Sequence, residues 1–155
     1  MKEFDFYIYI DYSEKLMGYL IIECKNKDVL LKKINGLKHF KDMRNKEQYL
    51  HKVKNIFKKN SIESLLYKSK IVYTRDTIII LEEVIFFIKK NRDFNIFISI
   101  DDKHHDSFVR LFKEFDNFDF IIIKESKLKI GTEEYQLSLI IDNLLNIERR
   151  KNDNN

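Results

Sequence analysis

The sequence has no proline, tryptophan or alanine, only three glycines and a single cysteine. One cysteine excludes an internal disulfide and a cysteine-rich zinc site. With so little glycine there is no glycine-rich loop, which excludes nucleotide binding of the P-loop or Rossmann type. Turns must therefore be recognised from polar breaks between apolar segments rather than from glycine or proline. The residues that are abundant instead (isoleucine, lysine, asparagine and phenylalanine) have A/T-rich codons, which indicates an A/T-rich genome.

Long apolar runs are also missing. No apolar run exceeds five residues, and the one at 77–81 is followed directly by Glu82 and Glu83, so no membrane span is expected. Charged residues in the first six positions interrupt the apolar stretch that a signal peptide needs, and we therefore expect a cytoplasmic protein. A length of 155 residues predicts a single domain over 1–150, followed by a frayed polar tail at 151–155. The net charge of +4 is small and evenly spread, so charge alone does not indicate a nucleic-acid partner.

The pattern of apolar residues predicts an α/β fold. Alternating or continuous apolar runs predict strands at 4–11, 16–24, 28–34, 70–74, 95–100 and 118–124. Helical spacing predicts helices at 42–59, 76–90, 105–115 and 133–150, the first of them capped by Asp42. A hairpin followed by strands that alternate with helices predicts a mixed sheet with an N-terminal antiparallel hairpin and helices on both faces.

Four aspartates fall where functional side chains gather in such a sheet. Asp11 closes the first strand, Asp101 and Asp102 follow the strand at 95–100, and Asp142 lies on the last helix, opposite its apolar stripe. Carboxylates that converge from separate elements suit Mg²⁺ or Mn²⁺, and two such ions would stabilise the attacking and leaving oxygens of phosphodiester cleavage. The alternative is that each is an ordinary turn or surface acid, since the chain has 25 of them.

Residues 8–13 (Ile-Tyr-Ile-Asp-Tyr-Ser) and the strand at 18–22 resemble the opening of an RNase H-like family of unknown function. Its members begin with a strand ending Asp-Glu-Ser-Gly and then a returning apolar strand. Segment 36–42 is similar to the family's Glu-(Leu/Ile)-(Lys/His) segment, 94–102 to its strand and acidic turn, and 135–143 to its closing Leu-Gln-Leu-Ala-Asp helix. The resemblance implies an RNase H-like sheet and a metal-dependent nuclease site formed by Asp11, Asp101 or Asp102, and Asp142.

The chain also departs from the family pattern. The glycine of the opening motif is Glu14, and the second acidic position falls on Gly36 or Leu37, so no carboxylate stands there. Glu23 or Asp42 are candidates to replace it.

The closing helix can be aligned in two ways. If Gln136 is the family glutamine, the family aspartate falls on Leu139, and Asp142 lies three residues further on. Alternatively, Asp142 is the family aspartate and the glutamine is lost. Both remain open from the sequence.

Two functions follow from this partial match. One is a nuclease that holds Mg²⁺ or Mn²⁺ and acts on nucleic acid. The other is a catalytically inactive relative that serves as an interaction or assembly module and could form a homodimer.

Two further features have ordinary explanations. His104 and His105 next to Asp101 and Asp102 suggest a transition-metal site, but adjacent residues of a helix point about 100° apart, which favours a solvated helix start. Tyrosines at alternate positions of the hairpin could stack on bases, although cross-strand packing is the more usual role.

Overall fold

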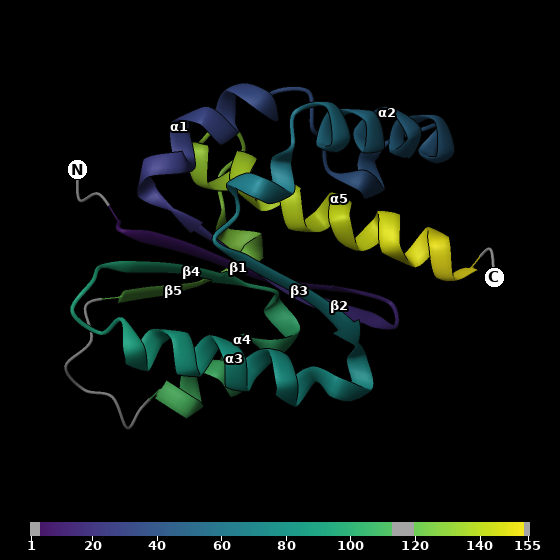
Figure 1. Ribbon diagram of the computed structural model, residues 1–155. Coiled ribbons are helices and arrows are strands. Elements are labelled where there is room, and N and C mark those ends of the chain that lie inside the picture. The colour runs from purple at the N-terminus through teal and green to yellow at the C-terminus, as the bar shows by residue number, and fades with distance from the viewer. Residues whose placement is uncertain (1–3, 113–119, 154–155) are drawn as a thin grey trace.

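The computed structural model describes residues 4–112 and 120–153, and its centre is one five-stranded sheet (Figure 1). The strands lie in the order β3-β2-β1-β4-β5. β1 pairs antiparallel with β2 and parallel with β4, while β2–β3 is antiparallel and β4–β5 parallel. The strand bounds are β1 (Phe6–Ser13), β2 (Leu16–Glu23), β3 (Lys68–Tyr73), β4 (Ile96–Ile100) and β5 (Phe120–Lys124). The mixed sheet with an N-terminal antiparallel hairpin is therefore confirmed.

The hairpin has a short turn at Glu14 and Lys15, and the backbone of Glu14 is left-handed with φ of 53°. Residues of β1 alternate between the two faces of the sheet. Tyr7 and Tyr9 belong to one hydrophobic cluster, and Ile8 and Ile10 to the other. Because both faces are covered, the strand is apolar along most of its length rather than alternating with polar residues.

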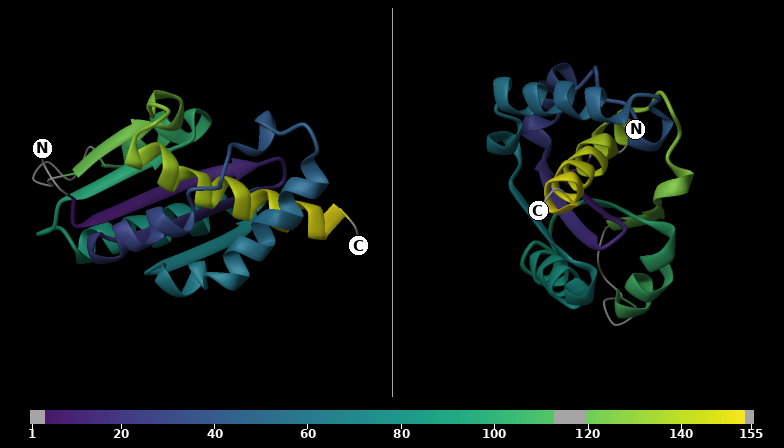
Figure 2. Two further views of the ribbon diagram at one scale, coloured as in Figure 1. Left: turned by 90° about the horizontal axis from the view of Figure 1, so that it is seen from above. Right: turned by 90° about the vertical axis from the view of Figure 1, so that its right-hand side faces the viewer.

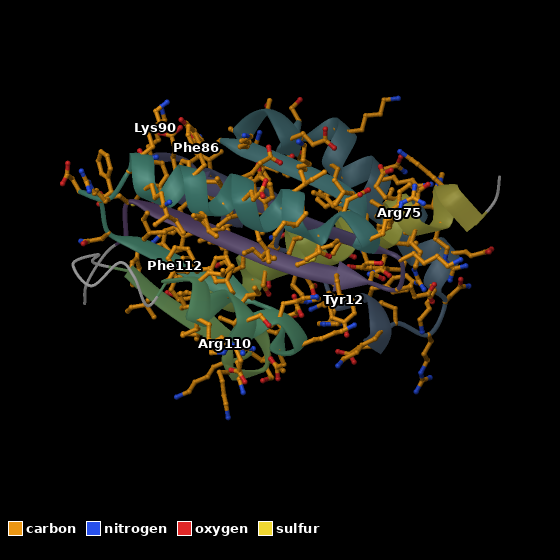
Figure 3. The ribbon with its side chains drawn as sticks, turned by 90° about the horizontal axis from the view of Figure 1, so that it is seen from below. Tyr12, Arg75, Phe86, Lys90, Arg110 and Phe112 are labelled. Carbon is orange, nitrogen blue, oxygen red and sulfur yellow. The ribbon has the colours of Figure 1, made fainter. Side chains whose placement is uncertain are left out.

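Helices cover both faces of the sheet, as predicted (Figure 2). On one face α5 packs against β1 and β2, with α1 and α2 beside it; α3 and α4 cover the other face. Figure 3 looks onto this second face, where α3 and α4 lie on either side of β1. The helix bounds are α1 (Cys24–Lys33), α2 (Lys46–Lys59), α3 (Thr77–Lys90), α4 (Asp102–Phe112) and α5 (Glu133–Asp153). Within the described ranges, no helix is both long and apolar enough to cross a bilayer.

Several local predictions were wrong. Residues 28–34 do not form a strand; they lie at the end of α1, where Leu30 and Ile34, four residues apart, are both fully buried on one side. The second helix begins at Lys46 rather than at Asp42, because the side chain of Asn45 caps it by accepting a hydrogen bond from the Gln48 N–H at 3.1 Å. Asp42 lies in a short 3₁₀ turn.

At the carboxyl end, the polar tail predicted from residue 151 is helical as far as Asp153. Residues 113–115 of the predicted fourth helix, and 118–119 of the last predicted strand, lie outside the described residues.

Candidate functional site

A cavity of about 630 Å³ opens at the edge of the sheet where β1, β4 and β5 end. These three strands are parallel to one another, so their carboxyl ends meet at this edge. All four aspartates singled out in the sequence line the cavity, together with two further acids. The full acidic lining is Asp11, Asp42, Asp101, Asp102, Glu125 and Asp142.

Asp11 projects from β1 and is only 7% exposed. Its Oδ1 accepts a hydrogen bond from the Tyr12 N–H at 2.8 Å. Burial, followed by the negative charges of Glu125 and Asp142, raises the pKa of Asp11 well above its usual value. Ionisation of Asp11 therefore destabilises the folded protein.

Asp101 directly follows β4 and is 3% exposed. Its Oδ2 lies 2.7 Å from Nδ1 of His104 and accepts the backbone N–H of the same residue at 3.0 Å. Its Oδ1 is buried and has no hydrogen-bond partner within the described part of the chain. Burial raises the pKa of Asp101, although the contact with His104 opposes the shift.

Asp142 reaches the cavity from α5. Its Oδ2 accepts a hydrogen bond from the Phe40 N–H at 2.9 Å. Burial raises the pKa of Asp142, and the nearby His39 and the Phe40 N–H partly offset this effect. Leu139, where one alignment places the family aspartate, is instead 2% exposed and packed in the core.

Asp102 lies at the rim of the same cavity. It accepts hydrogen bonds from the hydroxyl of Ser126 at 2.6 Å and from the N–H of Ser126 at 3.2 Å. These bonds lower the pKa of Asp102. Of the two acids that follow β4, Asp101 is therefore the buried one. Asp102 connects the start of α4, through its hydrogen bonds with Ser126, to the segment that follows β5.

Two residues of the site were not among the ligands expected from the sequence. Glu125 directly follows β5, and the rule that located Asp101 at the end of β4 would also have located it. His39 lies with its Nε2 3.8 Å from Oε1 of Glu125 and 3.8 Å from Oδ1 of Asp142. The Glu125 carboxylate, and then the charge of Asp142, raise the pKa of His39 against the effect of burial.

Of the two acids suggested as replacements for the missing carboxylate, one lies at the cavity and the other does not. Asp42 lines the cavity, whereas Glu23 ends β2 and forms an ion pair with Lys25 at 3.7 Å. Among residues 4–112 and 120–153, no three His, Cys, Asp or Glu side chains are arranged so that they could hold a metal ion.

The two adjacent histidines have separate partners. His104 contacts Asp101, while Nδ1 of His105 lies 3.0 Å from Oδ1 of Asp106. Tyr7, Tyr9 and Tyr19 of the hairpin are buried, and Tyr7 is in ring contact with Phe97 at 5.8 Å, so these tyrosines pack the core.

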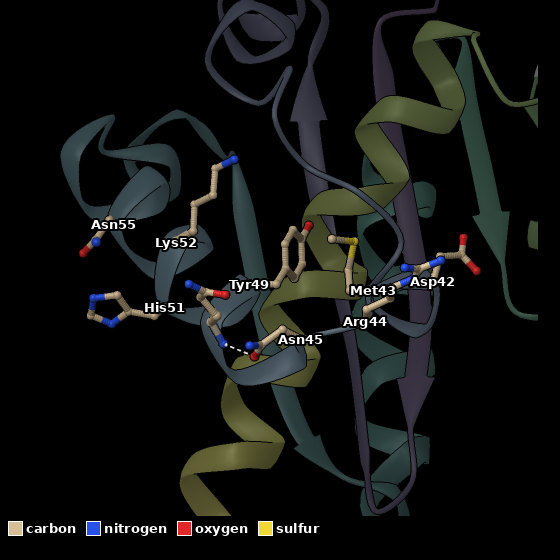
Figure 4. Close-up of a pocket in the computed structure, with 9 residues that line it drawn as sticks. Asp42, Met43, Arg44, Asn45, Tyr49, His51, Lys52 and Asn55 are labelled. Carbon is tan, nitrogen blue, oxygen red and sulfur yellow. Dashed lines mark hydrogen bonds between the residues drawn. The ribbon is translucent and has the colours of Figure 1, made fainter.

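A second cavity, of about 690 Å³, lies at the start of α2 (Figure 4). Asp42 lines both cavities, so the two adjoin. The basic side chains of the second cavity are those of Arg44, His51 and Lys52.

No protein-family model matches the chain, and no curated protein sequence does. Among solved structures, the chain is similar to one in the PCNA:RNase HII complex from Archaeoglobus fulgidus. The TM-score is 0.54 at 14% identity, and the match covers 94% of this chain and 73% of the other. The fold is RNase H-like. At this level of identity, the similarity extends to the fold alone.

Proposed function

We propose that the chain is a divalent-metal-dependent nuclease that hydrolyses phosphodiester bonds. The observation that carries this proposal is the convergence of carboxylates from three strand ends and α5 on one cavity, with those of Asp11, Asp101 and Asp142 buried. Its ligands would be Asp11, Asp101, Glu125 and Asp142, with Asp102 at the rim.

The donor set suits a cation. Burial and the neighbouring carboxylates raise the pKa of Asp11, and burial also raises those of Asp101 and Asp142. A dication among these groups would offset their repulsion, and Oδ1 of Asp101, which has no hydrogen-bond partner among the described residues, is available to it. Oxygen ligands of this kind favour Mg²⁺ or Mn²⁺. Such an ion supplies Lewis-acid stabilisation of the phosphoryl oxygens in the transition state.

The surroundings of the acidic cavity suit a polyanionic substrate. Lys41 and Lys103 line the same cavity as the acids, and the adjoining cavity carries Arg44 and Lys52. Cationic side chains that contact phosphates hold a nucleic acid in place without reading its sequence. In the proposed enzyme, they would hold the phosphates that flank the bond to be cut.

The first test is a calorimetric titration with Mn²⁺. Wild type should bind saturably, and Asp11→Asn should lose this binding. Asp106→Asn is a matched control, because Asp106 is an exposed aspartate on α4 outside the cavity, and this variant should bind as wild type does. The same three proteins are then assayed on DNA, RNA and hybrid duplexes. Cleavage that persists undiminished in Asp11→Asn would refute the assignment.

One observation favours a second function, a catalytically inactive module. In the part of the chain that the structure describes, the acids are not arranged as a metal site, and His39 lies beside two of them. Under this alternative, Mn²⁺ does not bind up to about millimolar concentration, since affinity follows the number and charge of the ligands. Self-association through an edge strand, β3 or β5, would then be tested by sedimentation.

A further inference from the structure

His39 contributes an imidazole to the lining of the acidic cavity. Its side chain is about 20% exposed, and its Nε2 lies 3.8 Å from a carboxylate oxygen of Glu125 and the same distance from one of Asp142. His39 directly precedes a 3₁₀ turn, Glu125 directly follows β5, and Asp142 lies in the middle of α5. The three residues lie on separate elements, and the fold brings them together.

Hydrogen bonds from two helices, α2 and α5, fix the backbone next to His39. On the side of α2, the hydroxyl of Tyr49 accepts from the Lys38 N–H at 2.7 Å and donates to the Lys38 carbonyl at 2.8 Å. On the side of α5, Asn143 donates to the same carbonyl at 3.1 Å, and Asp142 accepts from the residue after His39. These hydrogen bonds fix the backbone on both sides of His39, which limits the positions open to its imidazole.

The contacts of the ring fit a ligand better than a simple counter-ion. At 3.8 Å, Nε2 is too far from either carboxylate for a hydrogen bond. Nδ1 is buried and has no hydrogen-bond partner within the described ranges. A charged ring would therefore leave both N–H groups unbonded, whereas a neutral ring that binds a cation through Nε2 leaves only one.

Among the described residues no three such side chains are arranged for a metal ion, but the spacing permits His39 to share an ion with either carboxylate taken singly. Two donors bonded to one ion at about 2.1 Å can be no more than about 4.2 Å apart. The separations of 3.8 Å from His39 Nε2 to Glu125 and to Asp142 lie within that limit. A bound cation would offset the repulsion among the remaining carboxylates.

We propose that His39 is a metal ligand of this centre, through Nε2, and that it makes the site prefer a transition-metal dication to Mg²⁺. The inference rests on the proposed nuclease function, because it concerns the same cavity. Mg²⁺ binds oxygen donors, whereas first-row transition dications also bind imidazole nitrogen, with an affinity that is lowest for Mn²⁺ and rises along the row. A mixed nitrogen and oxygen donor set therefore separates Mn²⁺ from Mg²⁺ in a way that four carboxylates would not.

The test compares Mn²⁺ and Mg²⁺ affinities of wild type, His39→Gln and the control His105→Gln. His105 contacts Asp106 and does not line the cavity. The preference for Mn²⁺ over Mg²⁺ should fall about tenfold or more in His39→Gln, the scale of losses at metal-site residues, and stay unchanged in the control. The electron spin-echo modulation of bound Mn²⁺ should show nitrogen coupling in wild type and the control, but none in His39→Gln.

The outcomes separate the two proposals. Saturable Mn²⁺ binding without nitrogen coupling would overturn the role of His39 and leave the nuclease proposal standing. Absence of Mn²⁺ binding in every protein would overturn both. If His39→Gln fails to fold, wild type labelled with ¹⁵N-histidine replaces it, since a change in the modulation on labelling supports ligation by histidine and no change refutes it.

Discussion

The charge of Asp11 destabilises the folded state, because this carboxylate is buried close to Glu125 and Asp142. We expect Asp11→Asn to stabilise the protein when no metal is present. The amide oxygen can still accept the Tyr12 N–H, whereas the charge opposed by Glu125 and Asp142 is removed. Because burial and these charges raise the pKa of Asp11, its ionised form destabilises the folded state at every pH above that pKa.

The size and the pH dependence of the gain follow from this shift. Each pKa unit corresponds to about 1.4 kcal/mol. In a chain of this length, 1 kcal/mol moves Tm by about 2–4 °C, so each unit that is relieved adds about 3–6 °C at neutral pH. The gain should shrink as the pH falls through the folded-state pKa of Asp11. It should vanish below the unfolded value of about 3.9, where the carboxyl is protonated in both states.

The assay is thermal unfolding followed by circular dichroism, in a chelator, from about pH 4 to about pH 8. Asp106→Asn serves again as the control and should bring no gain at neutral pH, since the contact with His105 lowers the pKa of this exposed aspartate. A Tm of Asp11→Asn at or below that of wild type at neutral pH would refute the reasoning. So would a gain of the same size at every pH.

Three other predictions concern packing and the rim of the site. Gly18→Ala should cost about 1–3 kcal/mol in chemical denaturation, because the added Cβ would stand 2.9 Å from Cγ1 of Ile71; an unchanged midpoint would contradict this packing. Tyr49→Phe should lower the free energy of unfolding by about 1–3 kcal/mol, since both hydrogen bonds to Lys38 are lost. It should also weaken Mn²⁺ binding; binding equal to wild type would argue that these bonds do not position His39. Ile130→Ser should leave Tm unchanged but weaken binding of a single-stranded oligonucleotide about fivefold, roughly 1 kcal/mol, because this side chain is 83% exposed at the rim of the acidic cavity. Equal oligonucleotide affinities would exclude Ile130 from the contact.

Much of the fold could be predicted because its signals are local. β1, β2 and β4 are marked by runs of aromatic and β-branched residues, and α3 and α5 by helical spacing over many residues. Segment 28–34 was assigned wrongly because a short apolar run is compatible with either period when no alanine marks a helix. The start of α2 was missed by four residues because Asp42 and Asn45 are both good capping residues.

The site was harder to predict than the fold. Asp11, Asp101 and Asp142 could be chosen from 25 acids because each stands at a strand end or on a polar helix side. Glu125 was missed because it is followed by a polar stretch that reads as an ordinary loop. His39 could not be found in this way, since its position depends on hydrogen bonds from α2 and α5 to the turn that carries it.

The placement of α5 against the first strand has a consequence for synthesis of the protein. The hydroxyl of Tyr9 bonds to the carbonyl of Glu134, 125 positions later, and Ser13 bonds to Asn146 across 133 positions. At about 5–20 residues per second, a ribosome needs roughly 6 to 25 s to bridge the first interval. Throughout that time the hairpin exists without the helix that covers it. Asp11 therefore meets Asp142 only once α5 has been synthesised, so the acidic centre is completed long after the hairpin.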